Sequence, residues 1–138
     1  MFRRRERVNL VDTPEMDAFF ERLDRLREDQ LLAMRAAWHA TGRQEHEDAW
    51  TAVRAVGARD GLTGEIDRVR NKALAWTTRS SNTIPYLNSV DRAWQERKME
   101  AGEAVVDAAL AVALGSRLDA GSRDVLIEPW LRATVAAS

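Results

Sequence analysis

Apolar side chains recur three or four residues apart along most of this chain, and no other feature limits its fold as strongly. The longest such stripe comprises Met16, Phe19, Phe20, Leu23, Leu26, Gln30, Met34, Ala37 and Trp38. An α-helix turns once in 3.6 residues, so this spacing gathers the stripe on one face that must be buried. The pattern predicts an all-α fold in which helices pack their stripes against one another.

Capping residues and glycines bound the expected helices. Thr13 can cap free N–H groups, Pro14 suits a first helical turn, and Gly42 suits a helix end. The first helix should therefore run without a break from about residue 13 to residue 41. The other main helices are expected at residues 44–58, 63–80 and 88–117.

These helices predict one antiparallel bundle. The connections after the first and second of its four main helices are short, which favours antiparallel neighbours, and Pro129 is expected to open a short C-terminal helical segment. We divide the chain into an N-terminal arm, residues 1–12, and a single helical-bundle domain, residues 13–138. A chain of 138 residues can bury roughly 68% of its unfolded surface, so no disulfide or metal staple is required.

The fourth helix changes character halfway along. Between residues 104 and 114 its only charged residue is Asp107, and Leu110 and Leu114 continue the face that carries Glu103. A helix that is apolar on all sides must be covered on all sides. Either the C-terminal segment or a second subunit must cover these leucines, which makes Leu110, Leu114 and Trp130 interface candidates.

Asp107 is itself a candidate ligand-site residue. It ends an acidic series with Glu96, Glu100 and Glu103 at steps of four, three and four. Its own neighbours are apolar, and a buried carboxylate needs a hydrogen-bonding or charged partner. We expect Asp107 to be paired in the folded chain or to lie in a pocket.

A polar loop supplies the other ligand-site candidates. Arg79, Ser81, Asn82 and Tyr86 lie between the third and fourth helices. With backbone N–H groups they can hold an anion or a small polar ligand, although the segment lacks the glycine pattern of a phosphate-binding loop.

The composition argues against several kinds of metal site and catalytic site. There is no cysteine, and neither His39 nor His46 follows a glutamate at the spacing of a di-iron bundle. We interpret both histidines as parts of a surface turn and predict no cofactor and no metal ligands. No catalytic motif is present, so a non-enzymatic protein is favoured. Four of the five tryptophans fall on the expected inward stripes, which we interpret as core anchoring.

Charge and hydropathy limit the partners. The net charge of −1 argues against nucleic acid as the main partner. The longest apolar run, residues 108–114, is too short to span a bilayer, and the basic N-terminus precedes no signal-peptide core, so we expect no membrane partner and a cytoplasmic location.

Three functions remain as expectations. The first is a helical interaction or regulatory module that binds a protein partner or a second copy of itself through the Leu110/Leu114 face. The alternative is a small-ligand or metal-binding bundle that uses Asp107 or the polar loop. DNA binding through residues 53–73 is third, because Glu65 and Asp67 would face the phosphates.

Overall fold

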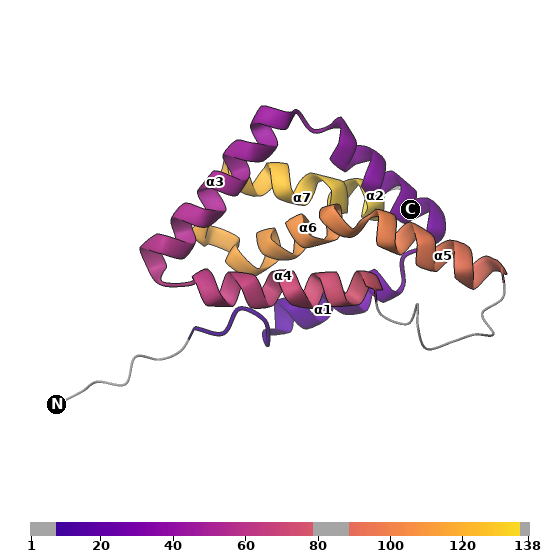
Figure 1. Cartoon of the computed structure of the whole chain (residues 1–138), viewed down its shortest axis with the longest axis horizontal. Coiled ribbons are helices and arrows are strands. Elements are labelled where there is room, and N and C mark those ends of the chain that lie inside the picture. Colours follow the sequence, from indigo (N-terminus) through magenta and orange to yellow (C-terminus); the bar gives the residue numbers. More distant parts are fainter. Residues whose placement is uncertain (1–7, 79–88, 136–138) are drawn as a thin grey trace.

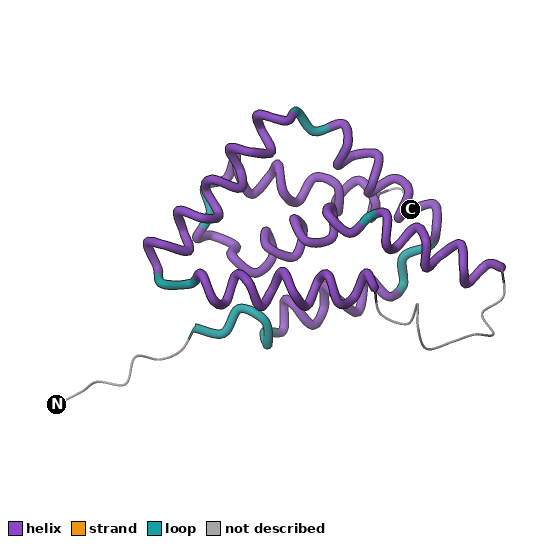
Figure 2. Tube along the Cα trace, viewed as in Figure 1, coloured by secondary structure: helices purple, strands orange, loops and turns teal. Residues whose placement is uncertain are grey.

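A computed structural model describes residues 8–78 and 89–135 of the chain. Within these ranges all regular structure is helical (Figure 2), which confirms the all-α class. The helices are α1 (Pro14–Asp24), α2 (Glu28–Ala40), α3 (Arg43–Asp60), α4 (Thr63–Thr78), α5 (Ser89–Glu100), α6 (Gly102–Leu114), the 3-10 helix η1 (Gly115–Arg117) and α7 (Ala120–Val135). The helices expected at residues 44–58 and 63–80 correspond to α3 and α4, whereas the first and fourth expected helices are each divided in two.

The prediction of one continuous helix over residues 13–41 is wrong, because the chain breaks between α1 and α2. At the break, the carbonyl of Leu26 accepts a hydrogen bond of 2.7 Å from Nε1 of Trp94 in α5. The N–H group of Arg27 donates to Oε1 of Gln30 at 2.8 Å, which caps the start of α2. Contacts made by side chains therefore satisfy backbone groups that a continuous helix would have bonded internally.

Two other expected boundaries also differ. The helix expected over residues 88–117 divides at Ala101 into α5 and α6. Pro129 does not open a short helix but lies inside α7. That helix is capped further upstream, where a carboxylate oxygen of Asp119 accepts the N–H of Ser122 at 3.0 Å. This cap lowers the pKa of Asp119, because it favours the charged form.

Helix α6 lies in the middle of the molecule (Figure 1), with α4 along one side and α2 and α3 as the two slanting sides. It packs against α1, α4 and α7. Leu110 and Leu114 are 0% and 2% exposed, and Trp130 of α7 is also buried. Both leucines are therefore covered within the chain, and α7 of the C-terminal segment is one of the helices that pack on α6. No described helix is long and apolar enough to cross a membrane.

The N-terminal arm docks against the helices from residue 10 onward. Leu10 and Val11 belong to the core, and the N–H of Leu10 donates to Oε2 of Glu65 in α4 at 3.2 Å. The same helix is joined to α3 by a tight turn in which Gly61 has φ 67° and ψ 34°, a left-handed conformation that glycine adopts without a steric penalty. This turn sets the spacing of α3 and α4 beside the site described next.

Candidate functional site

Asp107 is a buried residue of α6 that accepts hydrogen bonds from side chains of α2 and α3. Its Oδ1 accepts from Nε1 of Trp50 at 2.9 Å, and its Oδ2 accepts from Nε1 of Trp38 at 2.8 Å. Nε2 of His46 lies 2.6 Å from the same Oδ2 atom. The side chain of Asp107 is 3% exposed. The expected partner of this carboxylate is therefore a set of three nitrogen atoms from α2 and α3.

Burial and hydrogen bonding act in opposite directions on Asp107. Burial raises the pKa of the carboxyl group, because it removes the charged form from water. The hydrogen bonds from His46 and from the two indoles favour the carboxylate and offset part of that rise. The group is thus a buried acid whose pKa lies above its ordinary value and whose acceptor atoms are engaged.

The short contact engages Nε2 of His46, which lies 2.6 Å from Oδ2 of Asp107, and leaves the other ring nitrogen, Nδ1, outside the cluster. A neutral ring that donates from Nε2 carries a lone pair on Nδ1, and a protonated ring carries a donor there. Among the described residues no hydrogen-bond donor reaches Nδ1, and the His46 side chain is 24% exposed. Nδ1 is therefore open to a hydrogen bond with a bound molecule.

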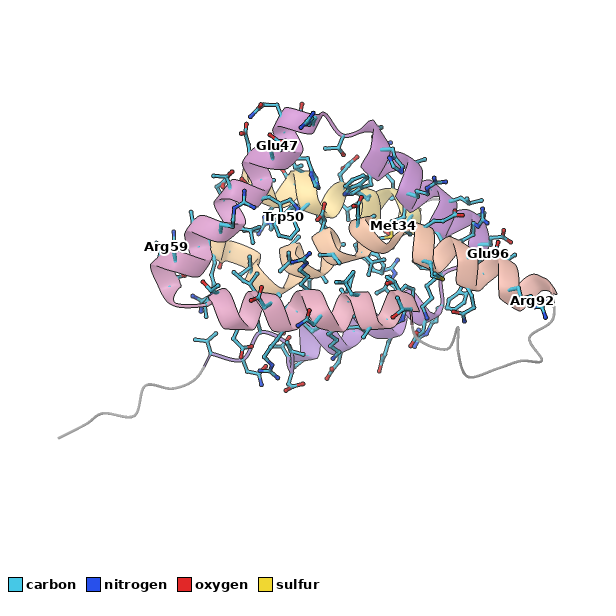
Figure 3. The ribbon with its side chains drawn as sticks, viewed as in Figure 1. Met34, Glu47, Trp50, Arg59, Arg92 and Glu96 are labelled. Atoms are coloured by element: carbon cyan, nitrogen blue, oxygen red, sulfur yellow. The ribbon has the colours of Figure 1, made fainter. Side chains whose placement is uncertain are left out.

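These side chains line a pocket of about 440 Å³ between α2, α3, α4 and α6. We call it the tryptophan pocket, and its lining residues are Trp38, His46, Glu47, Trp50, Arg54, Arg70, Glu103, Val106 and Asp107. Trp50 lies on the side of α3 that faces α6 (Figure 3). Small-molecule sites commonly enclose roughly 300–1,000 Å³, a range that includes this pocket. Its lining is mostly charged or polar, and the two indole rings and Val106 supply the apolar part.

The local sequence explains how the three donors converge. Trp38 lies in the last turn of α2, and the connection of Thr41 and Gly42 leads directly into α3. His46 and Trp50 are four residues apart, so they share one face of α3. The rings of Trp38 and His46 meet edge to face, with their centroids 5.0 Å apart. The short α2–α3 connection therefore brings all three donors to one carboxylate.

The charged groups around the pocket differ in how they are paired. Glu47 is bridged to Arg43 at 3.1 Å. Arg54 and Arg70 are exposed, and neither makes an ion pair with a carboxylate in the described part of the chain. Glu103 is also exposed and lies one helical turn before Asp107 on α6. The pocket thus carries two guanidinium groups that a ligand can reach.

The sequence located this site only in part. It identified Asp107 as a carboxylate in need of a partner, but the interpretation of His46 as part of a surface turn is wrong. Of the two histidines, His39 is exposed, whereas the side chain of His46 points inward to Asp107. Its position four residues before Trp50, an expected inward residue, is the signal that could have revealed it.

The remaining candidates do not join this site. Arg79, Ser81, Asn82 and Tyr86 lie outside the described residues. Leu110, Leu114 and Trp130 are interior residues, so they do not form an exposed face for a partner. In residues 8–78 and 89–135, no three His, Cys, Asp or Glu side chains converge as a metal ion would need.

Comparison of the chain with protein-family models, with curated proteins and with solved structures gave no match. Inferences about function therefore depend on the geometry of the tryptophan pocket.

Proposed function

We propose that this chain binds a small molecule in the tryptophan pocket. The observation that supports this function is the burial of Asp107, with its three nitrogen partners, at the base of a pocket of ligand-sized volume. A titratable group that is perturbed by burial and by specific partners, and that lies in a cleft, is typical of functional sites. The proposal corresponds to the ligand-binding alternative of the sequence analysis.

Stability alone gives little reason for such a polar cluster. Apolar residues of similar volume often replace a buried charged group without loss of stability, because removing the charge from water is costly. In the tryptophan pocket the carboxylate holds both indole rings and the His46 ring in place before any ligand binds. This preorganisation lowers the entropic cost of binding, which favours a binding role.

We favour ligand binding over self-association as the function of this chain. The expected dimer face depended on Leu110 and Leu114 lacking a cover, and both are enclosed by helices of the same chain. A protein partner is therefore not proposed from those residues.

Two pocket tryptophans allow a direct test. We would screen the protein by thermal shift against sugars, amino acids, nucleotides, aromatic acids and metal ions, and would then titrate each hit while recording tryptophan fluorescence. A ligand that binds the folded state raises the melting temperature in proportion to the logarithm of its concentration above the dissociation constant. We expect at least one hit that also changes the indole emission.

Matched tryptophan variants locate the response. Trp50→Phe should weaken or abolish the fluorescence change, because Trp50 lines the pocket. Trp94→Phe is the control, since Trp94 bonds to Leu26 away from the pocket. An unchanged response in Trp50→Phe together with a lost response in Trp94→Phe would place binding elsewhere. A panel without any hit would count against a specific pocket.

A further inference from the structure

We infer that the ligand of the tryptophan pocket carries an oxyanion, a carboxylate or a phosphate, which Arg54 and Arg70 bind. This inference rests on the proposed function and names the chemical class of the ligand. It depends on where the two arginines lie, on how the neighbouring carboxylates are engaged, and on the hydrogen-bonding capacity of the guanidinium group.

The two arginines stand where two hollows meet. A second hollow of about 380 Å³ continues along α3 and α4 from the tryptophan pocket. Trp50, Arg54 and Arg70 line both hollows. Arg54 comes from α3 and Arg70 from α4, so two separate helices bring positive charge to one junction. A ligand in either hollow can place an acidic group there.

Four carboxylates line the two hollows, and none of them is paired with Arg54 or Arg70 in the described residues. Asp107 is held by three nitrogen donors and Glu47 is bridged to Arg43, whereas Glu103 and Asp67 are exposed to solvent. Neither Arg54 nor Arg70 forms an ion pair in the described part of the chain, although the neighbouring Arg68 of α4 binds Glu65 at 2.7 Å. The pocket-lining arginines therefore retain their capacity for an external anion.

Guanidinium groups suit this task by geometry as well as by charge. Each presents a planar fork of N–H donors that matches the two oxygens of a carboxylate or a phosphate. A group bound between Arg54 and Arg70 would place the rest of the ligand against Trp50 and the apolar wall at Val106. Nδ1 of His46 remains for a hydrogen bond with a polar group of the same ligand.

A matched set of probes tests the charge requirement. Benzoate, benzamide, phenyl phosphate and inorganic phosphate would be titrated into the full chain by calorimetry at low ionic strength. Benzamide has nearly the shape of benzoate but no charge. We expect benzoate or phenyl phosphate to bind at least about tenfold more tightly than benzamide. Added salt should lower the affinity for the anionic probes but not the affinity for benzamide. The relative affinities of benzoate and the two phosphates then distinguish a carboxylate from a phosphate ligand.

Three glutamine variants separate the pocket from the general surface charge. Arg54→Gln and Arg70→Gln should each lower the affinity for the anions about tenfold, the loss of one charge-assisted contact. Arg123→Gln on α7 removes the same charge away from the pocket and should leave the affinity within about twofold of wild type.

The outcomes distinguish this inference from the proposed function. Equal affinities for benzamide and benzoate, or an equal effect of all three arginine variants, overturn the inference of an oxyanion ligand. The proposed function, a pocket that binds a small molecule, is then unaffected. The inference of an oxyanion ligand is also overturned if every hit in the thermal-shift panel is neutral or cationic, or if none of the anionic probes binds. Failure of both the probes and the panel overturns the oxyanion and the proposed function together.

Discussion

His46 and Asp107 lie 61 positions apart in the chain, yet Nε2 of the histidine is 2.6 Å from Oδ2 of the aspartate. This contact ties α3 to α6 and, with Trp38 and Trp50, surrounds one carboxylate with donors from two helices. The same contact leaves Nδ1 of His46 open to a hydrogen bond in the tryptophan pocket. The cluster thus joins the packing of three helices to the chemistry of the site.

Replacing Asp107 by asparagine should destabilise the fold by about 1–3 kcal/mol, the cost of leaving a buried donor without a partner. An amide has one acceptor oxygen, so its NH₂ group must face an N–H group of Trp50 or of the Trp38/His46 pair. Urea unfolding would measure the loss. Glu103→Gln, one turn away and exposed, is the control and should stay within about 0.5 kcal/mol of wild type. Equal stability of the two variants would contradict a buried carboxylate that depends on its donors.

The sequence predicted the local features of this fold because they depend on nearby residues. Thr13 caps α1 through its hydroxyl oxygen, which accepts the N–H of Met16 at 3.1 Å, and Pro14 opens that helix as expected. The apolar stripe from Met16 to Leu23 is buried. Periodicity and caps act within one or two helical turns, so a single sequence carries them.

The breaks and the site depend on residues far apart in the chain. No glycine or proline marks the end of α1, and the carbonyl of Leu26, between α1 and α2, accepts its hydrogen bond from Trp94, 68 positions later. In the same way, the sequence shows that Asp107 needs a partner but not which one, because its donors lie 57–69 positions away. Tertiary contacts decide such features, and spacing along one chain does not encode them.

Asp60 should make the stability depend on pH in the acid range. Arg59 and Arg117 bind its two carboxylate oxygens at 2.8 and 3.0 Å and lower its pKa to about 2. The folded state therefore holds this proton less tightly than the unfolded state, whose value is about 3.9. The stabilisation is complete above the unfolded value and is lost as the pH falls toward 2.

Urea unfolding of wild type and Asp60→Asn at a series of pH values tests this sign. The difference between the two proteins should be constant near pH 6 and should shrink toward pH 2. Because the three side chains are partly exposed to solvent, added salt should also reduce it. A difference that grows on acidification would show that the two arginines do not stabilise the ionised form.

Lys98 should stabilise the fold through two indole rings. It is 4% exposed, and its Nζ lies 4.4 Å from the ring centre of Trp76 and 5.0 Å from that of Trp94. Lys98→Met keeps most of the aliphatic stem and removes the charge, which should cost about 0.5–2 kcal/mol at this buried position. Lys72→Met is the control, because Nζ of the half-exposed Lys72 faces one phenyl ring, that of Phe20, at 4.8 Å. Thermal or urea unfolding should show a larger loss of stability for Lys98→Met than for Lys72→Met. A larger loss for Lys72→Met would be evidence that the two indole rings are not what makes Lys98 stabilising.

Gly57 and Gly64 should respond oppositely to alanine although both lie in helices. A Cβ atom on Gly57 would lie 3.0 Å from Cδ1 of Ile66 and 3.3 Å from Oγ1 of Thr63, closer than the ordinary contact distance between α3 and α4. The gain in helix propensity of about 1 kcal/mol is then offset by overpacking of about 1–3 kcal/mol, so Gly57→Ala should lower the free energy of unfolding. A Cβ atom on Gly64 meets nothing within 4 Å, and Gly64→Ala should raise that free energy by about 0.4–1 kcal/mol. Urea unfolding of both variants decides the matter: if Gly57→Ala were the more stable of the two, the close packing of α3 on α4 beside the pocket would be refuted.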